Sequence, residues 1–148
     1  MKWQLAELNI AHLRAPLDDP TTKEFVDALD EINALADLSA GFVWRLQTDD
    51  GNATGIRAFA DDLTITNLST WHSVQALGEF VYRSGHVEFL RRKREWFDKY
   101  GSAYLVLWWV AADERPSIDD ALERLAELET NGASPRAFTF AKPFPPPH

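Results

Sequence analysis

The chain of 148 residues contains no cysteine. That absence excludes disulfide bonds, thiolate nucleophiles and cysteine-based zinc sites. Long apolar runs are missing too, because no stretch approaches the roughly 20 apolar residues that a bilayer-spanning helix needs. The N-terminal MKWQLAELNI also lacks the unbroken apolar run of a secretory signal peptide. We therefore expect a cytoplasmic protein with no membrane partner.

Basic residues are outnumbered, since 15 lysines and arginines stand against 23 aspartates and glutamates, for a formal net charge of -8. Such a surface repels phosphate backbones, and nucleic-acid binders normally carry a basic excess, so we expect no nucleic-acid partner. The sequence also lacks a glycine-rich phosphate loop and a GxSxG nucleophile elbow. Both absences argue against nucleotide-dependent and serine-hydrolase chemistry.

Hydrophobic residues are plentiful, and their share of 45% predicts a single domain over residues 1–148 with one well-filled core. The six tryptophans and nine phenylalanines need a place in that core or in a binding site. Each large aromatic side chain buries on the order of 150 to 250 Å². The proline-rich end, about residues 138–148, predicts an extended tail that lies along the domain or a partner.

Apolar periodicity predicts the order of the secondary-structure elements. Alternating or β-branched stretches predict strands over residues 3–10, 42–47, 63–71 and 103–111, with a short additional strand over 55–60. Helical spacing predicts three helices: the first and the last begin after capping residues Asp19 and Ser117, and the second begins at Ser73. Gly85 marks a bend or break in the second of these helices, and Asn131-Gly132 ends the last.

The order β, α, β, β, α, β with an extra C-terminal helix is that of the α+β ferredoxin-like plait, whose helices cover one face of the sheet. The strand over 103–111 is apolar on both sides, so both must be covered. A bare apolar face would exceed the few hundred Å² that soluble monomers expose. We therefore expect a homodimer in which two sheets face each other.

The run Trp71-x-Ser73-x-x-Ala76-Leu77-x-x-Phe80, with His86 six residues later, resembles the dimeric α/β-barrel superfamily that includes the antibiotic-biosynthesis monooxygenases. With LAELNIAHLRAPLDDP, GFVWRL and RRKREWF, nearly the whole chain resembles a bacterial domain family of unassigned function. The resemblance implies a homodimer with a ligand between sheet and helices, usually one pocket per subunit. It also implies haem binding as an alternative, because some members hold haem with a helix histidine, a first-strand asparagine and a nearby tryptophan.

His86 is the first candidate catalytic residue. It shares a helical stripe with Phe89, Leu90 and Trp96, so we expect it to point inward, where a histidine can act as acid or base. A core histidine bonded to a backbone carbonyl explains the same pattern. A metal site is not expected, since His12 and His72 lack zinc-like spacing. No cofactor is required, and a haem held by His86 remains an alternative.

Polar residues of the strands form a second group of candidates. Glu7 and Asn9 share a face of the central first strand, and Asn67 lies on the neighbouring strand. A buried polar group must form a hydrogen bond, either within the protein or to a ligand, because leaving it unpaired costs roughly 1 to 3 kcal/mol. Structural hydrogen bonding explains these residues as well as a ligand does. If Glu7 faces a pocket, desolvation raises its pKa and makes it a candidate general base.

The basic run at residues 91–94 fans around a helix and makes no single patch, since four successive residues span about 400°. Arg92 differs from its neighbours because it lies within one turn of the His86 stripe, where it could bind a carboxylate or phenolate. Four aromatic residues are candidate walls of a pocket: Trp44, Trp71, Phe80 and Trp96. Trp44 and Trp71 lie on strands, where a tryptophan is more often part of the core.

These features favour a homodimeric protein that binds a small, mainly apolar, aromatic or polyketide-like molecule. Cofactor-independent oxygenation or proton transfer is the expected chemistry, with His86 as acid or base and with Glu7, Asn9 and Arg92 orienting oxygen atoms. A noncatalytic ligand sensor or a structural dimer with a filled core is one alternative, and a haem-binding protein is another. The sequence does not decide whether the protein is an enzyme.

Overall fold

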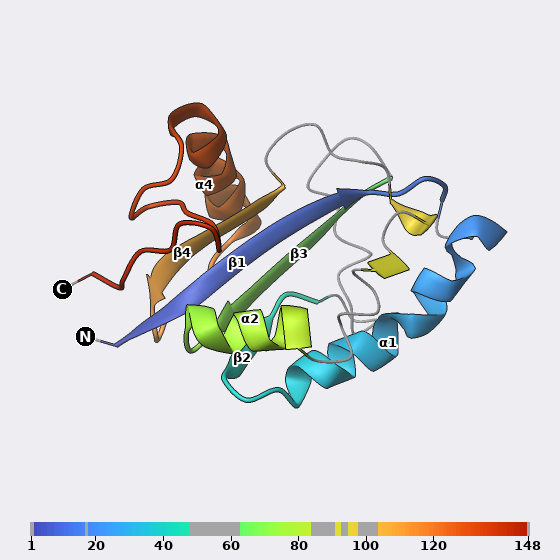
Figure 1. Ribbon diagram of the computed structural model, residues 1–148, viewed down its shortest axis with the longest axis horizontal. Coiled ribbons are helices and arrows are strands. Elements are labelled where there is room, and N and C mark those ends of the chain that lie inside the picture. Colours follow the sequence, from blue (N-terminus) through green and yellow to red (C-terminus); the bar gives the residue numbers. More distant parts are fainter. Residues whose placement is uncertain are drawn as a thin grey trace.

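The computed structural model describes residues 2–16, 18–47, 63–83, 91–92, 95–97 and 104–147. The named elements follow one another along the chain (Figure 1): β1 (Trp3–His12), the 3₁₀-helix η1 (Pro20–Thr22), α1 (Lys23–Asp37), β2 (Phe42–Arg45), β3 (Thr64–Trp71), α2 (Val74–Arg83), β4 (Leu105–Ala111) and α4 (Ile118–Asn131). The predicted strand over 55–60, Gly85 and His86 lie outside the described residues.

The four strands form one sheet in the order β2-β3-β1-β4, in which every neighbouring pair is antiparallel. This order confirms the predicted ferredoxin-like plait. The first strand is central, as expected, and its register places Glu7 between Ser69 of β3 and Leu107 of β4. Long-range pairing therefore gathers residues about 60 and 100 positions apart into one row.

Capping interactions that the sequence predicts set the helix ends. The Asp19 carboxylate accepts a hydrogen bond of 2.8 Å from the Thr21 N–H, ahead of Pro20 at the start of η1. The Ser117 hydroxyl accepts one of 3.1 Å from the Asp120 N–H at the start of α4. Gly132, at a φ of 78°, ends that helix. Caps at both ends thus confirm the predicted boundaries of α4.

The sheet separates two hydrophobic clusters. The face that carries Leu5 and Glu7, here the Glu7 face, packs against α2, the end of α1 and the C-terminal tail. The opposite face, here the α4 face, carries Ala6 and Leu8 and packs against α4. Side-chain alternation along β1 assigns residues to these two faces.

The expectation of a bare sheet face is wrong. The strand residues of the α4 face are buried within one chain, and Ala6, Leu8, Val106 and Trp108 are each 0% exposed. Ala121 and Leu125 of α4 belong to the same cluster and cover them. The C-terminal helix α4 thus covers the face that was expected to be covered by a second copy of the chain. The homodimer stays a prediction, without the support of an uncovered face.

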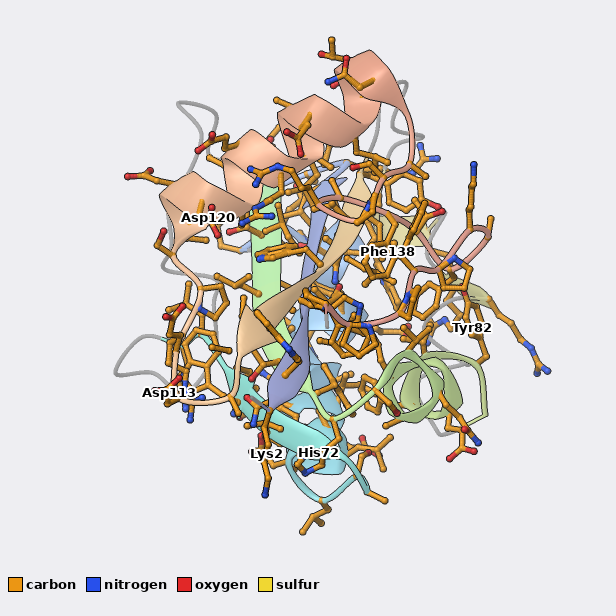
Figure 2. All side chains as sticks on the ribbon, turned by 90° about the vertical axis from the view of Figure 1, so that its left-hand side faces the viewer. Lys2, His72, Tyr82, Asp113, Asp120 and Phe138 are labelled. Carbon is orange, nitrogen blue, oxygen red and sulfur yellow. The ribbon has the colours of Figure 1, made fainter. Side chains whose placement is uncertain are left out.

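The C-terminal tail lies along the domain rather than away from it. Leu107 of β4 and Phe138 exchange two backbone hydrogen bonds of 2.8 Å, which adds a bridge outside the β4 edge. Figure 2 shows the tail descending from α4 past Phe138 toward α2, which carries Tyr82. The rings of Tyr82 and Phe140 meet edge to face at 5.6 Å. The tail therefore connects the sheet edge to α2.

None of the helices in the described part of the chain is long and apolar enough to cross a bilayer.

Candidate functional site

A row of polar side chains crosses the Glu7 face. β1 supplies Glu7 and Asn9, and β3 supplies Asn67, Ser69 and Trp71. The antiparallel register sets Asn9 opposite Asn67 and Glu7 opposite Ser69. Residues that face each other across two strands share one side of the sheet, so five side chains from two strands meet. We call these five residues the polar chain.

The polar chain is continuous in hydrogen bonds. The Asn67 Nδ2 group donates to Asn9 Oδ1 at 3.1 Å, and Asn9 Nδ2 in turn donates to Glu7 Oε1. On the other side, the Ser69 hydroxyl donates to Glu7 Oε2 at 2.9 Å, and the Trp71 indole N–H donates to Ser69 Oγ at 2.9 Å. Every donor in the chain thus leads toward the Glu7 carboxylate.

Glu7 is the buried centre of this arrangement, with 5% of its surface exposed. Burial raises the pKa of its carboxyl from 4.5 to about 6, and the hydrogen bonds from Asn9 and Ser69 only partly oppose that rise. Asn67 at the other end is exposed. A carboxyl group whose pKa lies near 6 changes its charge close to neutral pH, as a general base requires.

Aromatic rings flank the polar chain at its Trp71 end. The Trp71 ring stacks on Phe80 of α2 with a centroid separation of 5.2 Å and an interplanar angle of 29°. Phe42 of β2 meets the same indole edge-on at 5.3 Å. Gly41, at a φ of 84°, lets the turn before β2 approach the Ala76 side chain of α2, where a Cβ would collide. These contacts fix the position of the Trp71 N–H.

Trp44 does not join these aromatics, contrary to the proposed pocket wall. Its backbone pairs with Thr70, and its ring packs with the α4-face cluster under the guanidinium of Arg115, 5.7 Å away. The register shifts between Phe42 and Trp44, so Phe42 contacts Trp71 while Trp44 lies on the opposite face. The sheet itself separates Trp44 from Glu7.

Arg92 and Trp96 lie against α1 instead of on the polar chain. The Arg92 guanidinium pairs with Glu24 of α1 and, at 2.7 Å, with Glu95. It also lies 4.8 Å from the centre of the Trp96 ring, and that ring is 5.8 Å from Phe25. The expected carboxylate partner of Arg92 is thus provided by the chain's own glutamates, which leaves its role toward a ligand a prediction.

His86 lies outside the described residues, so its role as acid, base or haem ligand stays a prediction. Among the residues that the structure describes, no group of three or more histidine, cysteine, aspartate or glutamate side chains could hold a metal ion.

Two contributors were not foreseen from the sequence. Ser69 donates to the second oxygen of Glu7. An antiparallel alignment with Asn9 opposite Asn67 would have revealed it, since the residue two positions before Asn9 then faces the residue two positions after Asn67. Phe138 of the tail adjoins Leu107, the other cross-strand partner of Glu7. No local pattern predicts that contact, because the tail reaches it only after α4.

The arrangement can accept and hold a proton. A buried carboxylate accepts two neutral hydrogen bonds, an amide pair leads from it toward the surface, and an aromatic stack lies beside it. Such a group can remove a proton from a weakly acidic molecule, provided that the molecule lies within hydrogen-bond reach.

The fold recurs in solved structures of low sequence identity. PA3566 from Pseudomonas aeruginosa is 13% identical, with a TM-score of 0.50 over 77% of this chain and 98% of that one. SnoaB, a cofactor-independent oxygenase from Streptomyces nogalater, is 14% identical, with a TM-score of 0.49 over 75% and 94% of the two chains. Rv0793 from Mycobacterium tuberculosis is 12% identical, with a TM-score of 0.48 over 77% and 99%.

The likeness to PA3566 concerns the fold alone, which is the α+β ferredoxin-like plait. Residues 4–148 match the family described as Domain of unknown function (DUF3291), and the chain therefore belongs to that family. Both findings confirm the resemblance drawn from the sequence. No curated relative matches the chain.

Proposed function

We propose that the protein binds a small, mainly apolar, aromatic or polyketide-like molecule on the Glu7 face and removes a proton from it. Glu7 is the base in this proposal, Asn9 and Asn67 orient an oxygen atom of the ligand, and Trp71 and Phe80 offer aromatic surface. His86 retains its predicted part as a second acid or base. Arg92, which is paired with Glu24 and Glu95, retains its predicted part in orienting an oxygen atom of the ligand.

The observation that carries the proposal is the state of the Glu7 carboxyl. Buried carboxylates are usually paired with a cation, because desolvation of a lone charge is costly, but Glu7 is buried among neutral donors and its pKa is raised to about 6. Perturbed carboxyl groups of this kind are typical of acid and base catalysts. The buried position and the raised pKa of Glu7 support its assignment as a base near neutral pH.

Proton removal is also the step that opens cofactor-independent oxygenation. An enolisable ketone or a phenol that loses a proton becomes an electron-rich anion, and that anion is the form that donates electrons to O₂. Electrostatic stabilisation of the anion is the task of nearby N–H groups. Oxygenation is thus one outcome of the proposed proton transfer, and isomerisation is another.

A noncatalytic role is the rival proposal, and one observation favours it. Every hydrogen bond of the polar chain is made within the protein, and the Trp71 ring is 1% exposed between Phe42 and Phe80. A filled, self-satisfied face of this kind also suits a structural domain. Haem binding rests on His86 alone, and a Soret band that disappears in His86→Ala would establish it.

Exchange of the α-hydrogens of 2-tetralone, an enolisable aromatic ketone, tests the catalytic proposal. In D₂O at pH 7, NMR should show faster exchange with the wild type than with buffer. General bases contribute roughly 100-fold or more, so Glu7→Gln should lose most of the acceleration. Asn67→Ala should weaken it less.

Melting temperatures of all variants, with and without 2-tetralone, separate loss of the base from loss of folding. Equal exchange rates in wild type and Glu7→Gln would refute the assignment of Glu7 as the base. An unchanged melting temperature for the wild type with 2-tetralone, 2-naphthol and haemin would favour the structural rival.

A further inference from the structure

The hydrogen bonds of the polar chain have a direction, and that direction depends on the charge of Glu7. As an ionised carboxylate, Glu7 only accepts, so Asn9 must turn its Nδ2 group toward Glu7 and its Oδ1 toward Asn67. Asn67 then uses one N–H on Asn9 and turns its own Oδ1 away from the chain. The exposed end of the chain therefore presents a hydrogen-bond acceptor.

We propose that Asn9 couples Glu7 to Asn67, so that a proton arriving on Glu7 turns both amides and makes Asn67 present its NH₂ group to a ligand. A protonated Oε1 donates and needs an acceptor, which is Asn9 Oδ1 after rotation of that amide. Asn9 Nδ2 then faces Asn67 and donates a hydrogen bond, which Asn67 accepts with its Oδ1. Asn9 is in this way a positioning residue for Asn67.

The alternative is that the proton settles on Oε2 and points at Ser69, and this route loses a hydrogen bond. Ser69 Oγ already accepts from the Trp71 N–H, and its own hydrogen donates to Glu7. If Glu7 donated to Ser69 instead, the Ser69 hydrogen would have no acceptor in the polar chain. A polar group left unpaired in a partly buried place is disfavoured. The Asn9 route keeps every bond of the chain.

No charged side chain among the described residues competes for control of Glu7, whose pKa responds to burial, Asn9 and Ser69. β4 presents Leu107, and α2 presents Leu77 to the same cluster, while Glu79 and Tyr82 of α2 are exposed. The tail contributes Phe138. His86 is the titratable residue that the sequence places on this side, and it needs a control of its own.

The coupling names a ligand class, and this part rests on the proposed function. When Glu7 takes the α-hydrogen of a ketone, the C–H bond breaks, its electron pair forms the C=C bond, and the carbonyl oxygen becomes an oxyanion. At that moment Asn67 exchanges an acceptor for an NH₂ donor. The site would bind the oxyanion better than the ketone, which is how differential binding accelerates a reaction. Enolisable aromatic ketones fit this behaviour.

Side-chain NMR of the ligand-free protein tests the coupling. The amide ¹H–¹⁵N shifts of Asn9 and Asn67 should titrate with the same midpoint as the ¹³C shift of the Glu7 carboxyl. In Ser69→Ala all three midpoints should rise together, because Glu7 loses one donor but keeps Asn9. In Asn9→Ala the Glu7 midpoint should rise while the Asn67 amide no longer titrates. Asn9→Leu, closer in volume, repeats that measurement if the alanine variant unfolds.

Two outcomes would overturn the coupling. An Asn67 amide that still follows Glu7 without Asn9 would show a through-space effect of charge, and an Asn67 amide that ignores pH in the wild type would show no coupling. His86→Ala should leave the common midpoint of the two amides intact. The titration needs no ligand, so 2-tetralone exchange can fail while the coupling holds, and the coupling can fail while Glu7 still catalyses exchange.

Discussion

Glu7 sits at the centre of a sheet in which its neighbours on both sides are neutral. Most buried carboxylates are paired with a cation, because desolvation of a lone charge is costly. Here two neutral hydrogen bonds offset only part of that cost, and the pKa of Glu7 rises from 4.5 to about 6. The charged form of Glu7 therefore destabilises the fold relative to the protonated form.

That destabilisation gives a measurable pH dependence. The folded state binds the Glu7 proton more tightly than the unfolded state. Protonation of Glu7 therefore stabilises the fold fully below pH 4.5, and this stabilisation is lost as the pH rises past about 6. A rise of this size is worth about 2 kcal/mol. Relative to Glu7→Gln, the free energy of unfolding of the wild type should fall by about that amount over this window, as measured by urea denaturation. A constant difference would contradict the raised pKa.

The sequence predicts part of this site, for reasons that individual residues make clear. Alternation along the first strand assigns Glu7 and Asn9 to one face, and their meeting with Asn67 follows from the plait. The face on which Trp44 lies could not be predicted, because the irregular register after Phe42 changes which side chains of β2 share the face of Glu7. The ion pair of Arg92 could not be predicted either, because its partner Glu24 is 68 residues away on another helix and no local pattern reveals such a pairing.

At the scale of elements, α4 determines what the sheet can do. Its ends were predictable from Ser117 and Gly132, because caps are local signals. Its destination was not, because the plait fixes the face of the two crossover helices but leaves a helix after the last strand unassigned. By covering the α4 face, this helix leaves the Glu7 face as the side on which a ligand could act.

Truncating α4 at its contact with the sheet should be costly. Leu125 is 7% exposed in the α4-face cluster, so Leu125→Ala should lower the free energy of unfolding by about 2 to 5 kcal/mol. The exposed Glu123 of the same helix is the matched control, and Glu123→Ala should stay within about 0.5 kcal/mol of wild type. Chemical denaturation measures both. Equal stabilities would mean that α4 does not hold the sheet.

At the scale of the whole molecule, one chain buries both faces of its described sheet. A dimer formed sheet to sheet would have to displace α4, which fills that face. The homodimer predicted from the sequence therefore has to form through another surface or by exchange of α4 between chains. Sedimentation at micromolar concentration should then give about twice 16.8 kDa, and the mass of a single chain would contradict the homodimer.

The tail also belongs to the whole molecule, because it joins the sheet edge to α2. Phe138 is 0% exposed and contacts Phe144, whose carbonyl accepts a 2.9 Å hydrogen bond from the Trp109 indole. Phe138→Ala should reduce the free energy of unfolding by about 3 to 5 kcal/mol. Pro146→Ala, at an exposed position of the same tail, should change it by less than about 0.5 kcal/mol. Similar values for the two variants would show that the tail is not an integral part of the fold.

The bridge between Leu107 and Phe138 has a further consequence for behaviour at high concentration. An uncovered outer strand offers its backbone groups to strands of other molecules and can seed fibrils. Phe138 already occupies that position beside β4, and within the described residues the opposite border, β2, is only four residues long with an irregular register. The protein thereby limits the templates on which like chains could stack, and it does so with its own proline-rich end.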